Sequence, residues 1–300
     1  MRTTRVLLLV LGLFSVFNFM DVIPGYAQES SQFAAILLEG TDAVKMPQLN
    51  IGANWSYAYE GIPVISENQS LNGSISSGLK SPGVNLCIKP FSATEILKAS
   101  EVGKSNLNCT GTSFELNLTE QANFSLPGLG QGFYTLSLSD TNSSQELSAL
   151  QLLVAQEDLA LQLPSSIKAG DPLKVEANIS GINQSKIFGV IMISGQDYDN
   201  MSLNLTSRES GSGYNSTLKI GEREGQMPSL ASLSYDLAMD LLYLLPQNSA
   251  VAIQESLQSE VELFLITDTA WPKGEYILTC AVYSSKEGLL GLKQETVKVI

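Results

Sequence analysis

Asparagine is the residue type whose surroundings carry the clearest chemical signal in this chain. Twelve of the 17 asparagines begin an Asn-X-Ser/Thr triplet, in which the asparagine amide is the acceptor for an N-linked glycan. Serine and threonine make up about 18% of the residues, so chance placement would give about three such triplets. The excess predicts a glycoprotein. The candidate acceptors are Asn54, Asn68, Asn72, Asn108, Asn117, Asn123, Asn142, Asn178, Asn183, Asn200, Asn204 and Asn215.

Some acceptors lie where apolar and polar residues alternate. Asn117 stands between Leu116 and Leu118, and Asn204 is flanked in the same way. In a β-strand this alternation places the leucines on one face and the asparagine on the other, so a glycan would leave the packed face undisturbed. Polar strand faces favour asparagine, serine and threonine in any case, which explains part of the excess. No triplet follows Asn215, so the last third is expected to be an uncoated contact surface or simply helices and core strands.

Reactive side chains of other kinds are scarce. The chain has no histidine, which excludes Ser-His-Asp and Cys-His catalysis and removes the usual zinc ligand. It contains no phosphate-binding glycine loop and no Gly-X-Ser-X-Gly nucleophile motif. A carboxylate-only glycoside hydrolase would need two acids about 5–10 Å apart, and the sequence cannot single out a pair. We therefore expect no enzymatic activity and no cofactor.

Two stretches could bind a ligand. Asp197 and Asp199 could offer oxygen ligands to Ca²⁺, but a solvated turn beside a glycan triplet is the simpler interpretation, and we predict no metal site. Trp55, Tyr57 and Tyr59 alternate along one predicted strand and could stack on a sugar ring. The simpler interpretation of these aromatic residues is that they fill a core.

The three cysteines are an odd number for a secreted chain. Cys87 and Cys109 could form a disulfide that closes a loop of about twenty residues and contributes roughly 3 kcal/mol. Cys280 lies in an apolar strand pattern and is expected to be a buried free thiol. Plain core filling by all three cysteines is the alternative.

Residues 1–27 predict a secretory signal peptide. Arg2 and Arg5 form a basic start, an apolar run follows over 6–20, and small residues precede a cleavage site after Ala27. A retained membrane anchor is the alternative, but it would need nearer to about twenty apolar residues. We expect an extracellular or cell-surface protein.

The mature chain is acidic. Removal of Arg2, Arg5 and Asp21 changes the 17 basic and 30 acidic residues to 15 and 29, a net charge of about −14. An acidic surface repels phosphate backbones and gains nothing from counterion release, so we expect no nucleic-acid partner.

Short alternating segments separated by Asn, Ser and Gly turns predict β-strands through most of the chain. Two hairpins, 132–154 and 272–300, each begin with Gly-X-Tyr, where we expect the glycine to allow a tight turn and the tyrosine ring to fill the core. Pro63 indicates that the strand at 62–65 lies at a sheet edge. The pattern predicts a mainly β protein with two tandem immunoglobulin-like β-sandwich domains.

A change of period predicts a short helical insertion at about 228–258 in the second domain. Residues 228–245 are expected to form a helix that ends before Pro246, and 250–258 a weaker one. The leucine stripe is expected to pack across a sheet, the alternative being an exposed partner-binding helix. The stripe comprises Leu230, Leu233, Leu237, Leu241 and Leu244.

Several short segments with characteristic spacing lie in the last 140 or so residues. They are KAGDPLKV (168–175), FGVIMI (188–193), NLT (204–206), PKGEY (272–276), AVY (281–283), KEGL (286–289) and Gly291. With them, residues 160–300 resemble a domain of unassigned function that occurs in many secreted surface proteins of methanogenic archaea of the Methanosarcina type. The resemblance implies an archaeal envelope setting with glycans attached beyond the cytoplasmic membrane, and it brings no catalytic or binding residues.

Together these patterns predict a signal peptide (1–27), an N-terminal sandwich (28–157) and a C-terminal sandwich (158–300). The predicted function is that of a non-catalytic secreted or cell-surface glycoprotein, an envelope-associated interaction or structural module of an archaeon. The alternative is an extracellular binding protein for a carbohydrate or small solute. Envelope proteins or glycans are the expected partners, with no membrane span after signal cleavage.

Overall fold

The computed structural model describes twelve stretches of the chain. They are residues 34–45, 48–51, 55–57, 62–77, 83–90, 112–117, 121–141, 146–180, 184–207, 214–227, 244–284 and 287–300. Contacts divide them into two compact units. One unit holds the described residues up to Val154 together with 206, 207 and 214, and the other holds the rest. The predicted signal peptide at 1–27 lies outside the described residues.

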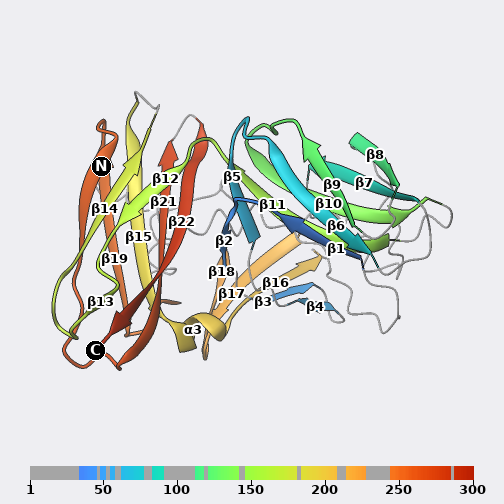
Figure 1. The fold of residues 1–300 in the computed structure, drawn as a ribbon. Coiled ribbons are helices and arrows are strands. Elements are labelled where there is room, and N and C mark those ends of the chain that lie inside the picture. Colours follow the sequence, from blue (N-terminus) through green and yellow to red (C-terminus); the bar gives the residue numbers. More distant parts are fainter. Residues whose placement is uncertain are drawn as a thin grey trace. The chain divides into compact units, whose positions relative to one another are not determined.

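The first unit contains a β-sandwich, here called the first sandwich (Figure 1). Its strands are β1 (Ala34–Leu38), β2 (Asp42–Val44), β5 (Ile62–Ser66), β6 (Leu71–Ser77), β7 (Gly83–Pro90), β8 (Thr112–Asn117), β9 (Gln121–Leu126), β10 (Gly132–Asp140) and β11 (Glu146–Ala155). One sheet has the order β1-β6-β9 and the other the order β2-β5-β11-β10-β7-β8. Between β2 and β5 the chain forms a hairpin of β3 (Gln48–Ile51) and β4 (Trp55–Tyr57).

The second unit contains the second sandwich. Its strands are β12 (Leu159–Gln162), β13 (Ser166–Ile167), β14 (Leu173–Ile179), β15 (Lys186–Ser194), β19 (Ser249–Ser256), β20 (Glu260–Leu265), β21 (Gly274–Ser284) and β22 (Gly288–Val299). One sheet has the order β12-β14-β20 and the other the order β13-β22-β21-β15-β19. The short β13 pairs in parallel with the end of β22.

The two sandwiches have the same strand order. The sheet β1-β6-β9 corresponds to β12-β14-β20, and β5-β11-β10-β7-β8 corresponds to β13-β22-β21-β15-β19. The registers correspond as well, because Leu71 pairs with Leu126 just as Leu173 pairs with Leu265. A three-stranded sheet packed on a longer sheet in this order is an immunoglobulin-like sandwich. The predicted mainly β fold with two such sandwiches is confirmed.

Each sandwich has an apolar core of its own between its two sheets. Alternating residues of one strand point to the same face, so an apolar set at every second position is buried while its neighbours remain in water. In β14 this pattern runs without a break from Leu173 to Ile179. In β15 both faces are buried from Lys186 to Ile193.

A tyrosine hydroxyl closes the same corner in each sandwich. Tyr134 donates a hydrogen bond of 2.9 Å to the carbonyl oxygen of Gly130, and Tyr276 donates one of 3.1 Å to that of Pro272. Each bond spans four residues at the start of the penultimate strand, which is the tyrosine corner of immunoglobulin-like domains. Trp271 stacks on Tyr276, with ring centroids 5.0 Å apart and 3° between the planes.

The Gly-X-Tyr repeat thus marks two equivalent corners. Gly132 and Gly274 have φ values of 153° and 157°, on the positive side that glycine adopts without steric cost. Tyr276 is buried in the core and Tyr134 packs against the core of the first sandwich. Burial is the main reason that the pKa of each tyrosine is raised.

A turn before the central strand of each three-stranded sheet is hydrogen-bonded to the loop that leads into the tyrosine corner. In the first sandwich the backbone N–H of Asn68 donates to the carbonyl oxygen of Leu129 at 3.2 Å. In the second, the N–H of Gly170 donates to Thr267 Oγ1 at 3.0 Å, and that hydroxyl donates to the carbonyl oxygen of Asp171 at 2.8 Å. The two sandwiches thus fix the same turn by hydrogen bonds from different residues.

An insertion separates β15 from β19. Its described elements are α3 (Gly195–Asp199), β16 (Met201–Ser207), β17 (Tyr214–Ile220) and β18 (Arg223–Met227), with the strands in the order β18-β17-β16. Ser194 caps α3, since its hydroxyl accepts a hydrogen bond from the N–H of Asp197 at 3.1 Å. Tyr198 of α3 is buried, and its hydroxyl accepts a hydrogen bond from Gln294 Nε2 at 3.1 Å.

Two local predictions are wrong. The helix expected at 250–258 is strand β19, because Ala250 to Ile253 supply β-branched and small residues that pair in register with β15. Pro63 does not mark an edge, since β5 lies between β2 and β11. Pro63 pairs with Ala43 of a three-residue strand, and alternate pairs of an antiparallel ladder need no hydrogen bond. Of the leucine-striped helix predicted over 228–245, residues 228–243 lie outside the described residues, and Leu244, the last leucine of the stripe, is buried.

We predict that Tyr276→Phe lowers the free energy of unfolding by about 1 kcal/mol, because it removes one neutral hydrogen bond and keeps the ring. Chemical denaturation followed by circular dichroism measures this loss. Tyr283→Phe, on the same strand, is the matched control and should cost less than about 0.5 kcal/mol. Equal effects of the two substitutions would show that the corner bond contributes nothing.

The buried phenol of Tyr198 should make the folded protein less stable at alkaline pH. Burial raises its pKa from 10.0 to about 12, so between these values the phenol ionises in the unfolded chain and stays protonated in the folded one. The raised pKa of Tyr198 therefore contributes on the order of 3 kcal/mol to the free energy of unfolding. This contribution is complete below about pH 10 and is lost as the pH rises through 12. Wild type should lose more stability between pH 9 and pH 12 than Tyr198→Phe, which has no phenol to ionise at this position. A constant difference would contradict the assignment.

Candidate functional site

The candidate glycan acceptors reach solvent more fully than the other described asparagines. Six of the seven acceptors with described side chains are exposed, and Asn204 is half-buried. The exposed ones are Asn68, Asn72, Asn123, Asn178, Asn200 and Asn215. Three described asparagines outside the triplets, Asn50, Asn85 and Asn248, are all half-buried. A glycan on any of the six would extend into water.

The remaining acceptors cannot be assessed in the same way. For Asn117 the structure describes only the backbone, at the end of β8. Asn54, Asn108, Asn142 and Asn183 lie outside the described residues. These five stay predictions from the sequence.

Asn68 lies in the turn between β5 and β6 and has a φ of 65°. This left-handed conformation crowds the Cβ atom of most residues, whereas asparagine tolerates it better than others. The N–H bond to Leu129 holds the turn against the loop that leads into the tyrosine corner. The acceptor therefore has a structural role besides its place in a triplet.

Asn72 and Asn123 belong to two triplets that face each other across β6 and β9. Asn72 pairs with Ser125 and Ser74 pairs with Asn123, so the hydroxyl residue of each triplet lies opposite the acceptor of the other. Ser125 Oγ donates a hydrogen bond of 2.8 Å to Asn72 Oδ1. A side chain at Gly73, between Asn72 and Ser74, would collide with the backbone of β1. Sequence reasoning missed this arrangement, because 51 positions separate the two acceptors.

In the second sandwich and its insertion the acceptors are more widely spaced along the elements. Asn178 is exposed on β14 between the buried Ala177 and Ile179, which is the alternation expected for a modified strand face. Asn200 follows the last residue of α3, and Asn215 lies near the start of β17. Each of these candidate acceptors thus lies on a strand face or at the end of an element.

The proposed calcium ligands are not in a loop but in α3. Asp197 Oδ2 accepts a hydrogen bond of 2.6 Å from the hydroxyl of Ser194, which fixes this carboxylate at the start of the helix. Asp199 is exposed at its end. Within the described stretches, no three acidic or cysteine side chains gather into a group that could hold a metal ion.

The aromatic platform falls where side chains are not described. Trp55 and Tyr57 belong to β4, for which the structure gives only the backbone, and Tyr59 lies outside the described residues. The stacking hypothesis stays a prediction.

The cysteines have different environments. Cys87 is buried in β7 and is disulfide-bonded, while Cys109 lies outside the described residues, so their pairing stays a prediction. Cys280 is a free, buried thiol in β21, as the sequence predicted. Burial raises the pKa of Cys280, so the thiol remains protonated and unreactive near neutral pH.

Lys186, at the start of β15, is a buried cation that the sequence did not single out. Its ammonium donates hydrogen bonds of 3.3 Å to the carbonyl oxygens of Gln184 and Leu257. Desolvation lowers its pKa. Because these bonds connect the ammonium to the turn after β19, we assign Lys186 a structural role.

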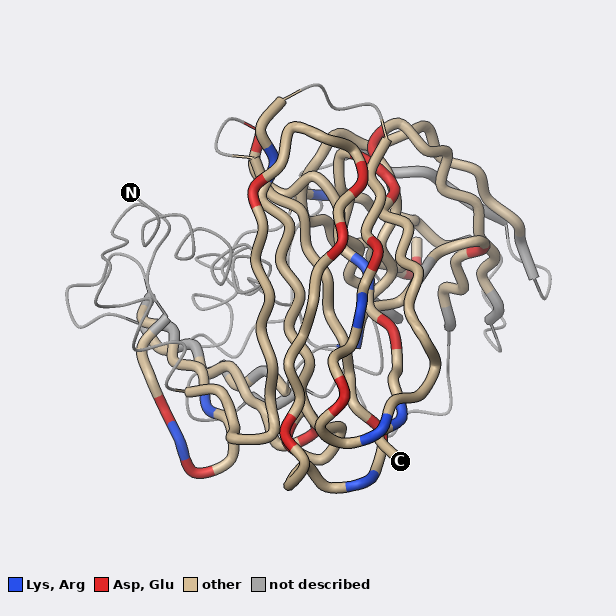
Figure 2. The backbone as a smooth tube through the Cα atoms, turned by 90° about the vertical axis from the view of Figure 1, so that its left-hand side faces the viewer, with Lys and Arg blue, Asp and Glu red and all other residues tan. Residues whose placement is uncertain are grey.

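Figure 2 shows acidic residues spread over strands and turns, with basic residues interspersed among them. In the part of the chain that the structure describes, no helix is long and apolar enough to cross a membrane.

Comparison with known proteins does not identify a family. No family model and no curated protein matches the chain. Among solved structures, one match is the crystal structure of red sea bream transglutaminase, with a TM-score of 0.28 and 7% identity. That match covers 91% of this chain and 32% of the transglutaminase chain. A likeness this low carries no argument about activity.

The left-handed turn gives a testable prediction. Asn68→Ala should be less stable than Asn68→Gly by about 1 kcal/mol, since only the former places a Cβ atom in a strained conformation. Thermal or denaturant unfolding measures the difference. Ser70→Ala is the control, because it removes the same triplet and leaves Asn68 in place. Equal stabilities of the alanine and glycine variants would contradict the strain.

Proposed function

We propose that this chain is a non-catalytic secreted or cell-surface glycoprotein, an envelope-associated interaction or structural module of an archaeon. The observation that carries the proposal is the position of the acceptors. Six described acceptor side chains are exposed, while the described asparagines outside triplets are half-buried. The archaeal setting rests on the resemblance of residues 160–300 to the Methanosarcina-type surface domain.

The architecture is compatible with this role. In an immunoglobulin-like sandwich the outward side chains of each strand do not pack in the core, so a strand can carry a bulky polar group on that face without disturbing the core. Asn178 illustrates this, because its neighbours Ala177 and Ile179 are fully buried while its own side chain is exposed. Such a scaffold acts through its surface rather than through a catalytic cleft.

The test is glycopeptide mass spectrometry on protein purified from a native source. We expect glycans on most of the six exposed acceptors, because their side chains reach solvent. Asn50, Asn85 and Asn248 are internal controls and should be unmodified, since they lack the triplet. Unmodified asparagines at most of the triplets would remove the main support for the proposal.

A further inference from the structure

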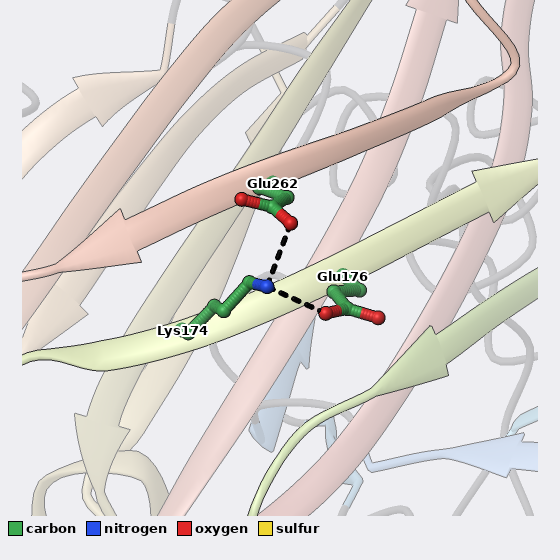
Figure 3. A network of polar contacts seen from close by, with 3 residues as sticks. All are labelled: Lys174, Glu176 and Glu262. Carbon is green, nitrogen blue, oxygen red and sulfur yellow. Dashed lines mark ion pairs between the residues drawn. The ribbon is translucent and has the colours of Figure 1, made fainter.

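An ionic cluster lies on the outward face of the second sandwich's three-stranded sheet. Lys174 Nζ lies 2.7 Å from a carboxylate oxygen of Glu176 and 2.6 Å from one of Glu262, joining β14 to β20 (Figure 3). The lysine side chain is 43% exposed and that of Glu262 54%. Exposed pairs of this kind contribute little to stability, so the cluster calls for another explanation.

The strand register shows which residues of the first sandwich occupy the positions of Lys174, Glu176 and Glu262. The pair Leu71–Leu126 of the first sandwich corresponds to the pair Leu173–Leu265 of the second. Counting forward from Leu71 and Leu173, and backward from Leu126 and Leu265, then matches each residue of β6 and β9 with one residue of β14 and β20. The positions correspond as follows: Lys174 to Asn72, Glu176 to Ser74 and Glu262 to Asn123. The ionic cluster and the facing pair of glycan triplets therefore occupy equivalent sites.

These sites adjoin an edge strand in each sandwich. Within the described sheets, β9 and β20 are the last strands of their three-stranded sheets. An edge strand offers unpaired backbone groups to other chains, and charged side chains are a common protection. On β20 the exposed Glu260 and Glu262 provide that charge. On β9 the exposed side chains of Asn123 and Ser125, whose counterparts on β20 are Glu262 and Phe264, are uncharged.

We propose that N-glycans on Asn72 and Asn123 protect the β9 edge of the first sandwich, in place of the charges that protect β20 in the second. The inference rests on the proposed function, since it requires that the protein is glycosylated. Two bulky, hydrated groups beside β9 exclude an incoming strand by volume, whereas the glutamates exclude one by charge.

The geometry leaves room for both glycans. Asn72 and Asn123 are diagonal neighbours on one face, a relation in which Cα atoms lie about 7–8 Å apart. The hydrogen bond from Ser125 uses Oδ1 of Asn72 and not Nδ2, the atom that carries the sugar. Leu37 lies opposite Ser74 on β1 and is 59% exposed, so sugars on this face would also cover an apolar side chain.

The modification is a group transfer from a lipid-phosphate-linked oligosaccharide. Asparagine Nδ2 forms a bond to the anomeric carbon of the sugar, the bond from that carbon to the phosphate oxygen breaks, and the lipid phosphate leaves with the electron pair. Nδ2 loses one proton. The chain itself supplies only the acceptor amide and the triplet hydroxyl.

The test compares variants of the full chain made in a host that glycosylates the wild type. Ser74→Ala with Ser125→Ala removes both triplets, and Ser74→Thr with Ser125→Thr is the matched control that keeps them. Glycopeptide mass spectrometry reports occupancy, and sedimentation velocity reports self-association. We expect the alanine pair to self-associate several-fold more than wild type and the threonine pair to remain like wild type.

A charge graft provides the decisive variant. Asn72→Lys with Asn123→Glu places the charges of Lys174 and Glu262 at the two exposed equivalent positions and lacks both sugars, and the buried Ser74 is left unchanged. We expect this protein to stay as monomeric as wild type. If the alanine pair does not fold, Asn72→Gln with Asn123→Gln removes the sugars and keeps both hydroxyl groups.

The outcomes separate the two proposals. Glycans elsewhere but none on Asn72 and Asn123 would overturn the edge protection and leave the proposed function standing. Absence of glycans at every triplet would overturn the proposed function itself. If both acceptors are occupied and the variants without sugars do not self-associate, the protective role is wrong.

Discussion

The hydrogen bond from a tyrosine hydroxyl to a carbonyl oxygen four residues upstream fixes the corner on which each sandwich depends. At this corner the chain crosses from the three-stranded sheet to the longer one, between β9 and β10 and between β20 and β21. The Tyr134 and Tyr276 bonds set where the next strand begins, and the turns at Asn68 and Gly170 are hydrogen-bonded to the loops that lead into these corners. Register in both sheets follows from this fixed point, because a slip of one residue would turn every core side chain outward.

The sequence predicted those parts of the fold in which local pattern and tertiary environment agree. The closing hairpins and β14 alternate cleanly, and the structure places them as expected. The sequence predicts a helix where β19 lies. Buried and exposed residues do not alternate regularly along this edge strand, and only its pairing with β15 shows that it is a strand. Asn72 and Asn123 lie close together because of the register between two strands that are distant in the sequence. No local pattern contains that information.

The same topology carries two surface chemistries. On the second sandwich the outward face of β14 and β20 holds Lys174 and two glutamates, and its exposed acceptor, Asn178, lies further along the strand. On the first sandwich the equivalent face holds amides and hydroxyls, with a glycine at position 73 that lets β1 approach closely. The cores differ in sequence but meet the same packing requirement. The two sandwiches differ in the charge of their outward residues on this face.

The parallel pairing of β13 with β22 has a mechanical consequence. The two bonds that flank it, from Lys298 N–H to the carbonyl oxygen of Ser165 and from Ile300 N–H to that of Ile167, are both 2.9 Å long and lie across the strand direction. Tension applied to the second sandwich along these strands would load both bonds in shear at the same moment. In an antiparallel hairpin pulled from its open end, the bonds would instead break in succession. Two bonds that are loaded together resist such tension better than two bonds that break one after the other.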